Sequence, residues 1–218
     1  MQKQTTKNKA YIQLHIAVFL FGFTAILGKL ISLDEVALVW NRLWIAVLGL
    51  VFIPGVIQGI QSISRKNVLR FIGIGVLVAL HWLTFYGSIK IGQSASVTLA
   101  CLATASLFTS VLEPLITKSK FQWIELILGI IVIAGIYLLS GVGKSYHLAI
   151  IVGIISAFLA ALFSTLNKKY IARQNSLSVT TIELTSGFIF ISLGYPFIES
   201  YMPQPQWIPV GSDWVWLI

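Results

Sequence analysis

Residues 148–163 read LAIIVGIISAFLAALF, a run without a charged side chain. Such a run predicts a helix that crosses a lipid bilayer, because a span needs about 20 mostly apolar residues and a helix satisfies its own backbone hydrogen bonds in the hydrocarbon. The chain contains seven complete runs of this kind, and an eighth begins at Trp214. The seven complete predicted spans are residues 11–31, 35–53, 68–89, 93–115, 123–141, 147–167 and 178–198.

The composition of the chain also indicates an all-α integral membrane protein. Of its 218 residues, 57% are hydrophobic and 10% are charged, and the formal net charge is +8. A soluble globular protein of this size would not carry so much apolar surface. The basic residues are spread along the chain rather than gathered on one face, which argues against a nucleic-acid partner. Cys101 is the only cysteine, so we expect no disulfide within the chain and no thiolate metal site. We also expect no other metal site and no cofactor.

The distribution of Lys and Arg predicts the orientation in the membrane. Assigning the connecting segments alternately to the two sides places eleven of these residues on the N-terminal side and three on the other. Cytoplasmic loops collect such residues. We therefore expect a cytoplasmic N-terminus in a bacterial inner (plasma) membrane, with outer loops near residues 32, 91, 144 and 205. The eleven are Lys3, Lys7, Lys9, Arg65, Lys66, Arg70, Lys118, Lys120, Lys168, Lys169 and Arg173, and the three are Lys29, Lys90 and Lys144.

A faint internal repeat relates the two parts of the chain. AVFLFG at 17–22 followed by VALVW at 36–40 resembles AFLAAL at 157–162 followed by VTTIE at 179–183. Because an odd number of spans separates the two copies, they insert with opposite orientations. Inverted repeats are typical of secondary transporters, whose substrate site lies near the midplane of the membrane. Short loops further predict that neighbouring helices pack antiparallel.

Several short motifs resemble the EamA-type transporters of the drug/metabolite transporter superfamily. They are Gly28-Lys29, Trp40-Asn41-Arg42, IGQSAS at 91–96, LEPL at 112–115 and LGIIVIAG at 128–135. The resemblance covers essentially the whole chain, and it implies ten helices built as two inverted five-helix repeats. On that basis residues 1–143 form the first repeat and residues 144–218 an incomplete second one. The resemblance also implies transport of small metabolites by alternating access.

Ionisable groups inside a bilayer are functional candidates because they are costly to bury. Arg42 lies seven residues beyond Glu35, about 10 Å below the outer surface at a rise of about 1.5 Å per residue. Its guanidinium group matches a carboxylate or phosphate with two parallel hydrogen bonds. The alternative is that the side chain extends back to the outer interface. The predicted substrate-binding residues are Trp40, Asn41, Arg42, His81, Thr84 and Thr98, with packing as the alternative role for His81.

Glu183 is the acidic residue of greatest interest in the seventh predicted span. Its side chain is too short to reach the interface easily, so we predict that it is a proton-coupling residue. His15 lies at a similar depth and is its predicted partner. The alternative is that Glu183 is a protonated core residue without a role in coupling.

These features favour a secondary-active transporter of amino-acid-like or anionic small metabolites, and we expect an exporter. The expected partners are a small-molecule substrate and the lipid bilayer. The sequence has no phosphate-binding loop and no HExxH motif, so we do not expect an enzyme. The alternatives are a non-transporting scaffold or regulatory protein and an inactive truncated product, with an intramembrane enzyme in third place.

Overall fold

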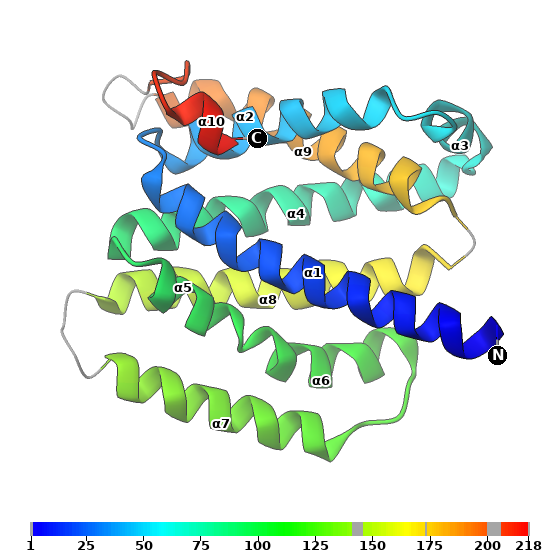
Figure 1. Cartoon of the computed structure of the whole chain (residues 1–218), viewed down its shortest axis with the longest axis horizontal. Coiled ribbons are helices and arrows are strands. Elements are labelled where there is room, and N and C mark those ends of the chain that lie inside the picture. Colours follow the sequence, from blue (N-terminus) through cyan, green and yellow to red (C-terminus); the bar gives the residue numbers. More distant parts are fainter. Residues whose placement is uncertain (1, 141–145, 173, 200–205, 218) are drawn as a thin grey trace.

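The computed structural model describes residues 2–140, 146–172, 174–199 and 206–217, and the secondary structure within these ranges is helical. The long helices lie side by side along one axis and alternate in direction (Figure 1). An all-α bundle is therefore confirmed. The helices are α1 (Gln2–Leu30), α2 (Glu35–Val51), α3 (Val56–Ser62), α4 (Arg65–Gly92), α5 (Ala95–Leu102), α6 (Ala105–Thr117), α7 (Trp123–Ser140), α8 (His147–Tyr170), α9 (Ser176–Glu199) and α10 (Asp213–Leu217).

Five segments in the described ranges are long and apolar enough to cross a membrane. A sixth arises if α2 and α3, which are bent by 93° relative to each other, form one span. The apolar part of α7, Trp123–Gly135, is shorter. By length and composition the structure thus supports five or six of the seven predicted spans. The five are Tyr11–Leu30, Arg65–Gly92, Ala95–Thr117, His147–Tyr170 and Ser176–Phe197.

Two predicted spans have different boundaries in the structure. The second was expected to reach residue 53, but α2 ends at Val51 and the chain turns through Gly55, whose φ of 88° lies in the left-handed region that glycine adopts easily. The fourth was expected as one helix over 93–115. It is instead interrupted between α5 and α6, where the Thr104 hydroxyl donates a hydrogen bond to the Cys101 carbonyl oxygen at 2.6 Å. The predicted repeat boundary at residues 143 and 144 lies outside the described residues.

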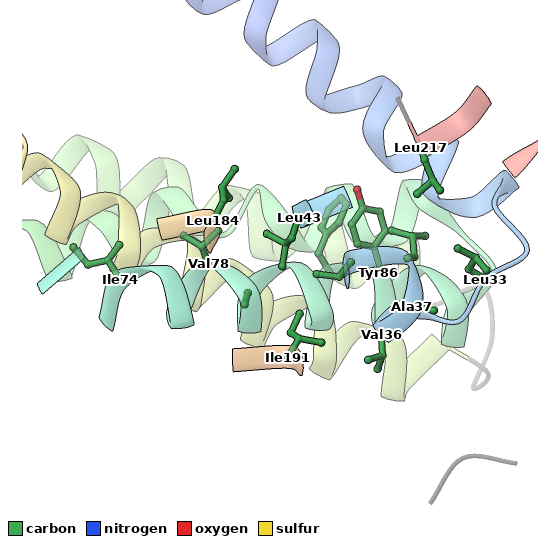
Figure 2. Packing of buried hydrophobic residues seen from close by; sticks show 14 of the residues in the cluster. Leu33, Val36, Ala37, Leu43, Ile74, Val78, Tyr86, Leu184, Ile191 and Leu217 are labelled. Carbon is green, nitrogen blue, oxygen red and sulfur yellow. The ribbon is translucent and has the colours of Figure 1, made fainter. Parts of the chain in front are cut away.

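Helix α4 occupies the centre of the bundle. Its most extensive contacts are with α8 on one side and α9 on the other (Figure 1). Figure 2 shows the buried apolar side chains that α2, α4, α9 and α10 contribute to one cluster, among them Leu43, Tyr86, Ile191 and Leu217. The helices that carry the predicted site residues are therefore held by a shared core.

Glycines allow α4 to approach both neighbours closely. A Cβ atom added at Gly75 would lie 2.1 Å from the Glu183 carbonyl oxygen of α9. On the other side, a Cβ at Gly153 of α8 would lie 2.8 Å from the Cys101 Cβ and 3.0 Å from the Ser88 Oγ of α4. Close approach at small residues is the usual means of packing helices in lipid, where the hydrophobic effect does not drive helices together.

Apolar side chains cover the outer faces of the peripheral helices. Phe19 of α1 is 66% exposed, and Ile131 of α7 is 60% exposed. Such surface is unfavourable in water but matches the acyl chains of a bilayer. The exposed faces of α1 and α7 therefore agree with a protein that is surrounded by lipid.

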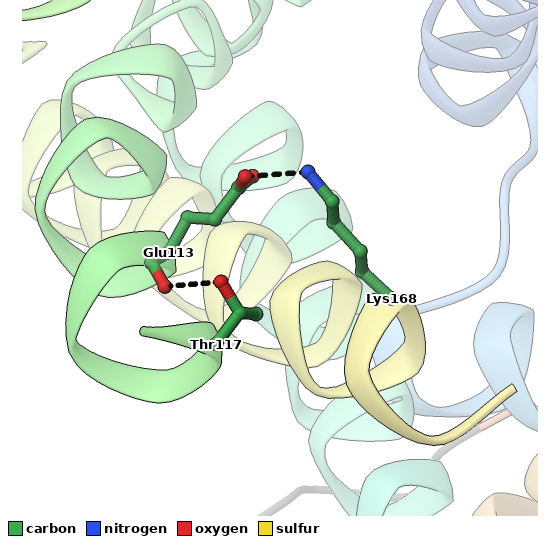
Figure 3. A network of polar contacts seen from close by, with 3 residues as sticks. All are labelled: Glu113, Thr117 and Lys168. Atoms are coloured by element: carbon green, nitrogen blue, oxygen red, sulfur yellow. Dashed lines mark hydrogen bonds and ion pairs between the residues drawn. The ribbon is translucent and has the colours of Figure 1, made fainter. Parts of the chain in front are cut away.

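An ion pair joins α6 and α8 at the end of the bundle where α1 begins, which we call the N-terminal end. Lys168 of α8 pairs with Glu113 of α6, and the Thr117 hydroxyl donates a hydrogen bond to the Glu113 carbonyl oxygen at 2.8 Å (Figure 3). The Lys168 side chain is 61% exposed. Exposed pairs of this kind contribute between about 0 and 1 kcal/mol, so this one fixes geometry more than stability.

We expect Gly75→Ala to destabilise the protein by about 1–3 kcal/mol, because the new methyl group overlaps backbone atoms of α9. Gly73→Ala is the matched control on the same helix, since a Cβ there meets nothing within 4 Å. Its expected effect is a gain of up to about 1 kcal/mol from helix propensity. Thermal unfolding in detergent measures both variants. Equal behaviour of the two would contradict close contact between α4 and α9 at Gly75.

Candidate functional site

The three consecutive residues of the predicted α2 motif point to different neighbours. The Trp40 Nε1 donates a hydrogen bond to the Ser192 Oγ of α9 at 3.0 Å. The Asn41 Nδ2 donates to the carbonyl oxygens of Ala37 at 2.8 Å and Trp207 at 2.9 Å. Successive helix residues are rotated by about 100°, so adjacent positions cannot all face one substrate. Asn41, which is 2% exposed, joins α2 to the segment around Trp207.

A cavity of about 310 Å³ lies beside Trp40. Its lining includes Ser192 and Tyr195 of α9 together with Trp207. The Trp207 ring packs edge-on against Trp40, with ring centroids 5.8 Å apart. Trp40, a predicted substrate residue, thus lines this cavity.

Arg42 lies against α4 and the C-terminal segment. Its Nη1 donates a hydrogen bond to the Tyr86 hydroxyl oxygen at 2.6 Å, and its Nη2 donates to the Trp216 carbonyl oxygen at 3.1 Å. The guanidinium carbon also lies 5.4 Å from the centre of the Tyr86 ring. The Arg42 Nε is buried and has no hydrogen-bond partner among the described residues. Within the same ranges, the ion pair between Lys168 and Glu113 is the only one, so no described carboxylate neutralises Arg42.

Tyr86 is a site residue that sequence reasoning missed. Its side chain is 2% exposed, and its hydroxyl oxygen accepts a hydrogen bond from Arg42. Gly28 makes room for it, because a Cβ at Gly28 would lie 2.4 Å from the Tyr86 Cε1. The motif at Gly28 therefore has a physical role. The signal available in the sequence was a small residue at the end of α1 that would face the end of α4.

The other predicted substrate residues lie at separate helix contacts. The His81 Nδ1 lies 2.9 Å from both the carbonyl oxygen and the hydroxyl oxygen of Ser156 on α8. The Thr84 hydroxyl donates to the Leu80 carbonyl oxygen of its own helix at 2.8 Å. Thr98 is 1% exposed, and its Oγ1 lies 2.7 Å from the Ser88 Oγ. The structure does not bring the six predicted residues into one cluster.

Glu183 and His15, the predicted proton-coupling pair, are not brought together. His15 is exposed on α1, and its Nδ1 lies 2.8 Å from the Tyr11 carbonyl oxygen of the same helix. Glu183 is 5% exposed, and its Oε2 accepts a hydrogen bond from the Asn167 Nδ2 of α8 at 3.2 Å. The neighbour of Glu183 is therefore an amide rather than an imidazole. The sequence places Asn167 on a weakly polar face of the sixth predicted span, which was the signal for this contact.

A hydrogen-bonded group ties the C-terminal segment to the loop between α1 and α2. The Asp213 carboxylate accepts hydrogen bonds from the Ser32 backbone N–H at 3.0 Å and from the Ser32 hydroxyl at 2.6 Å. Burial opposes ionisation of Asp213, but these bonds and the charge of Lys90 outweigh it and hold the pKa of the carboxyl below its ordinary value. The Lys90 ammonium donates to the Ile31 carbonyl oxygen in the same loop. Together these contacts hold α10 over the Arg42 side of the bundle.

Residues 8–141 match the EamA-like transporter family. The chain belongs to this family. The match covers more than half of the sequence, and the family is one of transporters rather than enzymes. No curated protein and no solved structure matches the chain in the corresponding comparisons.

With the family shown, this EamA-like chain is an integral membrane transporter, and its interior polar groups are the candidates for substrate and ion contact. Two sites stand out: Arg42 with Tyr86 and Trp216, and Glu183 with Asn167. The described residues include no group of three or more His, Cys, Asp or Glu side chains that could hold a metal ion. The assignment of two repeats stays a prediction.

We expect Asp213→Asn to loosen the C-terminal segment by about 1–3 kcal/mol, because an amide cannot accept both bonds from Ser32. The lowered pKa adds a pH dependence. Stability from the ionised form is complete above the ordinary aspartate pKa of about 4 and is lost as the pH falls through the lowered value.

Hydrogen exchange of residues 31–34 and 206–217 measures this loosening. Asp34→Asn is the control, since Asp34 is an exposed aspartate of the same loop. The wild type should exchange faster in acid, and the Asp213 variant should exchange fast at every pH. Equal exchange in both variants at neutral pH would show that Asp213 does not hold the segment.

Proposed function

We propose that this EamA-like chain is a secondary-active exporter of small metabolites that carry an anionic group, such as amino-acid-like compounds, and that it works by alternating access. Arg42 is the proposed anion-binding residue. Tyr86, bonded to one end of the guanidinium, is a positioning residue. Glu183 is the proposed proton-coupling residue.

One observation supports the proposal that the substrate is anionic. Arg42 is a permanently charged group inside a transporter, and the described residues provide no carboxylate for it. Among the described residues, one of its donors, Nε, has no hydrogen-bond partner, and Nη2 bonds a neutral carbonyl oxygen. A carboxylate or phosphate would accept from Nε and Nη2 side by side and supply the missing charge. Such a ligand would replace the Trp216 carbonyl oxygen at Nη2.

The position of the C-terminal segment supports alternating access to this site. The Trp216 carbonyl oxygen accepts a hydrogen bond from Arg42, and the neighbouring Leu217 is 5% exposed in the hydrophobic core. In this arrangement α10 covers the guanidinium. A substrate would reach Arg42 only after α10 moves away or after the bundle opens at its other end, and a carrier requires such a closed side.

We expect Arg42→Lys to raise the apparent KM for carboxylate substrates about tenfold or more, because an ammonium cannot form the planar two-point contact. Reconstituted vesicles with radiolabelled L-amino acids and short carboxylic acids measure this change. The carboxamide of each amino acid is the matched probe, since it lacks the anionic group. Wild-type protein should transport the acids and not the carboxamides.

Arg65→Lys is the protein control, because it makes the same chemical change at an exposed position. It should leave KM unchanged. Normal transport by both Arg42→Lys and Arg42→Ala, in protein that elutes as a single folded species, would exclude Arg42 as the anion-binding residue. The guanidinium would then serve only to hold Tyr86 and Trp216.

We also propose that the N-terminus is cytoplasmic. This rests on the eleven-to-three distribution of basic residues and on the alternating helix directions in Figure 1. Single cysteines at Lys66, Lys120 and Val210 in a Cys101→Ser background test it with an impermeant thiol reagent on intact cells. All three positions are exposed. We expect labelling at residue 210 alone, and labelling at 66 or 120 without 210 would reverse the orientation.

A further inference from the structure

Glu183 and Asn167 face each other across α9 and α8 with an incomplete set of hydrogen bonds. The Asn167 Nδ2 donates to the Glu183 Oε2 at 3.2 Å. The remaining oxygens of the two groups, Glu183 Oε1 and Asn167 Oδ1, are both buried and have no partner among the described residues. Both are acceptors, so this contact lacks a donor.

We propose that the contact is a proton-binding site in which one proton completes a two-bond pair between the Glu183 acid and the Asn167 amide. The Glu183 Oε1–H donates to the Asn167 Oδ1, while the Asn167 Nδ2 donates to the Glu183 Oε2. A single hydrogen then satisfies both buried oxygens. Asn167 is thereby a positioning residue for the proton. The inference rests on the proposed function in that this proton is the coupling ion.

The surroundings of Glu183 favour its neutral form. A buried carboxylate needs a cation or several donors, and in the described ranges the hydrogen-bond partner of the Glu183 carboxyl is the Asn167 amide, while several ionisable side chains of the neighbouring helices make contacts elsewhere. The α4 residue packed against the Glu183 backbone is Gly75, and α3 carries no ionisable side chain. The engaged groups are Lys168 with Glu113, Lys169 over the Tyr170 ring, Arg70 with Asn67 and Tyr170, His81 with Ser156, and Arg42 with Tyr86.

The pair links the proton to the relative position of two helices. Asn167 lies on α8 and Glu183 on α9, and both helices pack on α4. When α9 shifts away from α8, the Oε1–H loses its acceptor and water gains access. The proton then passes from Oε1 to a water oxygen, and a carboxylate remains. Return of α9 toward α8 requires that a proton be taken up again.

Infrared spectroscopy of the full chain in detergent, without substrate, tests the pair directly. We expect a hydrogen-bonded neutral carboxyl C=O band near neutral pH that is lost in Glu183→Gln. In Asn167→Ala the band should shift to higher frequency, because the carbonyl loses the Nδ2 bond and the hydroxyl loses its acceptor. Thr165→Val is the matched control, because the Thr165 hydroxyl, two residues away on α8, is also buried and has no hydrogen-bond partner in the described ranges. It should leave the band unmoved.

A double variant in which the acid and the amide change places keeps the test valid if Asn167→Ala fails to fold. Asn167→Asp combined with Glu183→Gln places the acid on α8 and the amide on α9. If the pair is the proton site, this double variant regains a neutral, hydrogen-bonded carboxyl band and takes up one proton, as the wild type does. An ionised carboxylate signal for Glu183 at neutral pH, or a band that does not move in Asn167→Ala, would overturn the pair.

Transport in vesicles separates this inference from the proposed function. If the infrared band shows the pair but a proton gradient does not drive accumulation of the carboxylate substrates, the proton site is supported and its role in coupling is refuted. Proton-driven accumulation with an ionised Glu183 refutes the pair and leaves the transporter in place. The infrared result thus decides the site, and the gradient experiment decides its use.

Discussion

The close approach of α4 to α8 and α9 is the constraint on which the rest of this bundle depends. In lipid, apolar area gives little drive for association, so helices are held by dispersion contacts and hydrogen bonds that act only at short range. Gly75 and Gly153 remove the side chains that would keep these helices apart. The approach in turn brings Ser156 within reach of His81 and Ser186 within reach of the Ile72 carbonyl oxygen. Polar contacts between helices follow from the glycines.

The buried polar side chains differ in whether their hydrogen-bonding groups have partners. The Thr84 hydroxyl donates a hydrogen bond to a carbonyl oxygen of its own helix, and the Thr98 hydroxyl bonds a hydroxyl of α4. Both groups therefore already have partners within the bundle. Five buried side-chain atoms lack a partner among the described residues, and three of them belong to Arg42, Asn167 and Glu183. Unpaired groups are costly where water is absent, and this cost is the reason for proposing ligand or proton binding at Arg42 and at the contact of Glu183 with Asn167.

The sequence predicted the parts of this protein that depend on local composition. Apolar runs located most helix ends to within a few residues, although α1 begins nine residues before its predicted span, and the short motifs pointed to the correct family. The interruption after Leu102 and the bend after Val51 were missed because an apolar run looks the same whether or not its helix is continuous. The partner of Glu183 was missed for a different reason. Depth along a helix suggested His15 for Glu183, but partners depend on rotation and on helix neighbours, and α9 faces Asn167 of α8.

The two candidate sites lie on different helices that contact one another. Glu183 and Ser192 lie on α9, nine residues or roughly 14 Å apart at about 1.5 Å per residue, and Ser192 bonds Trp40 on the helix that carries Arg42. Helix α4 likewise carries both Tyr86, which holds Arg42, and Gly75, which packs on the Glu183 backbone. A displacement of α9 that opens the Glu183 contact would therefore also pull on α2 through Trp40. Binding at Arg42 and proton release at Glu183 would then bias the same movement, which is the requirement for coupling two sites without direct contact between them.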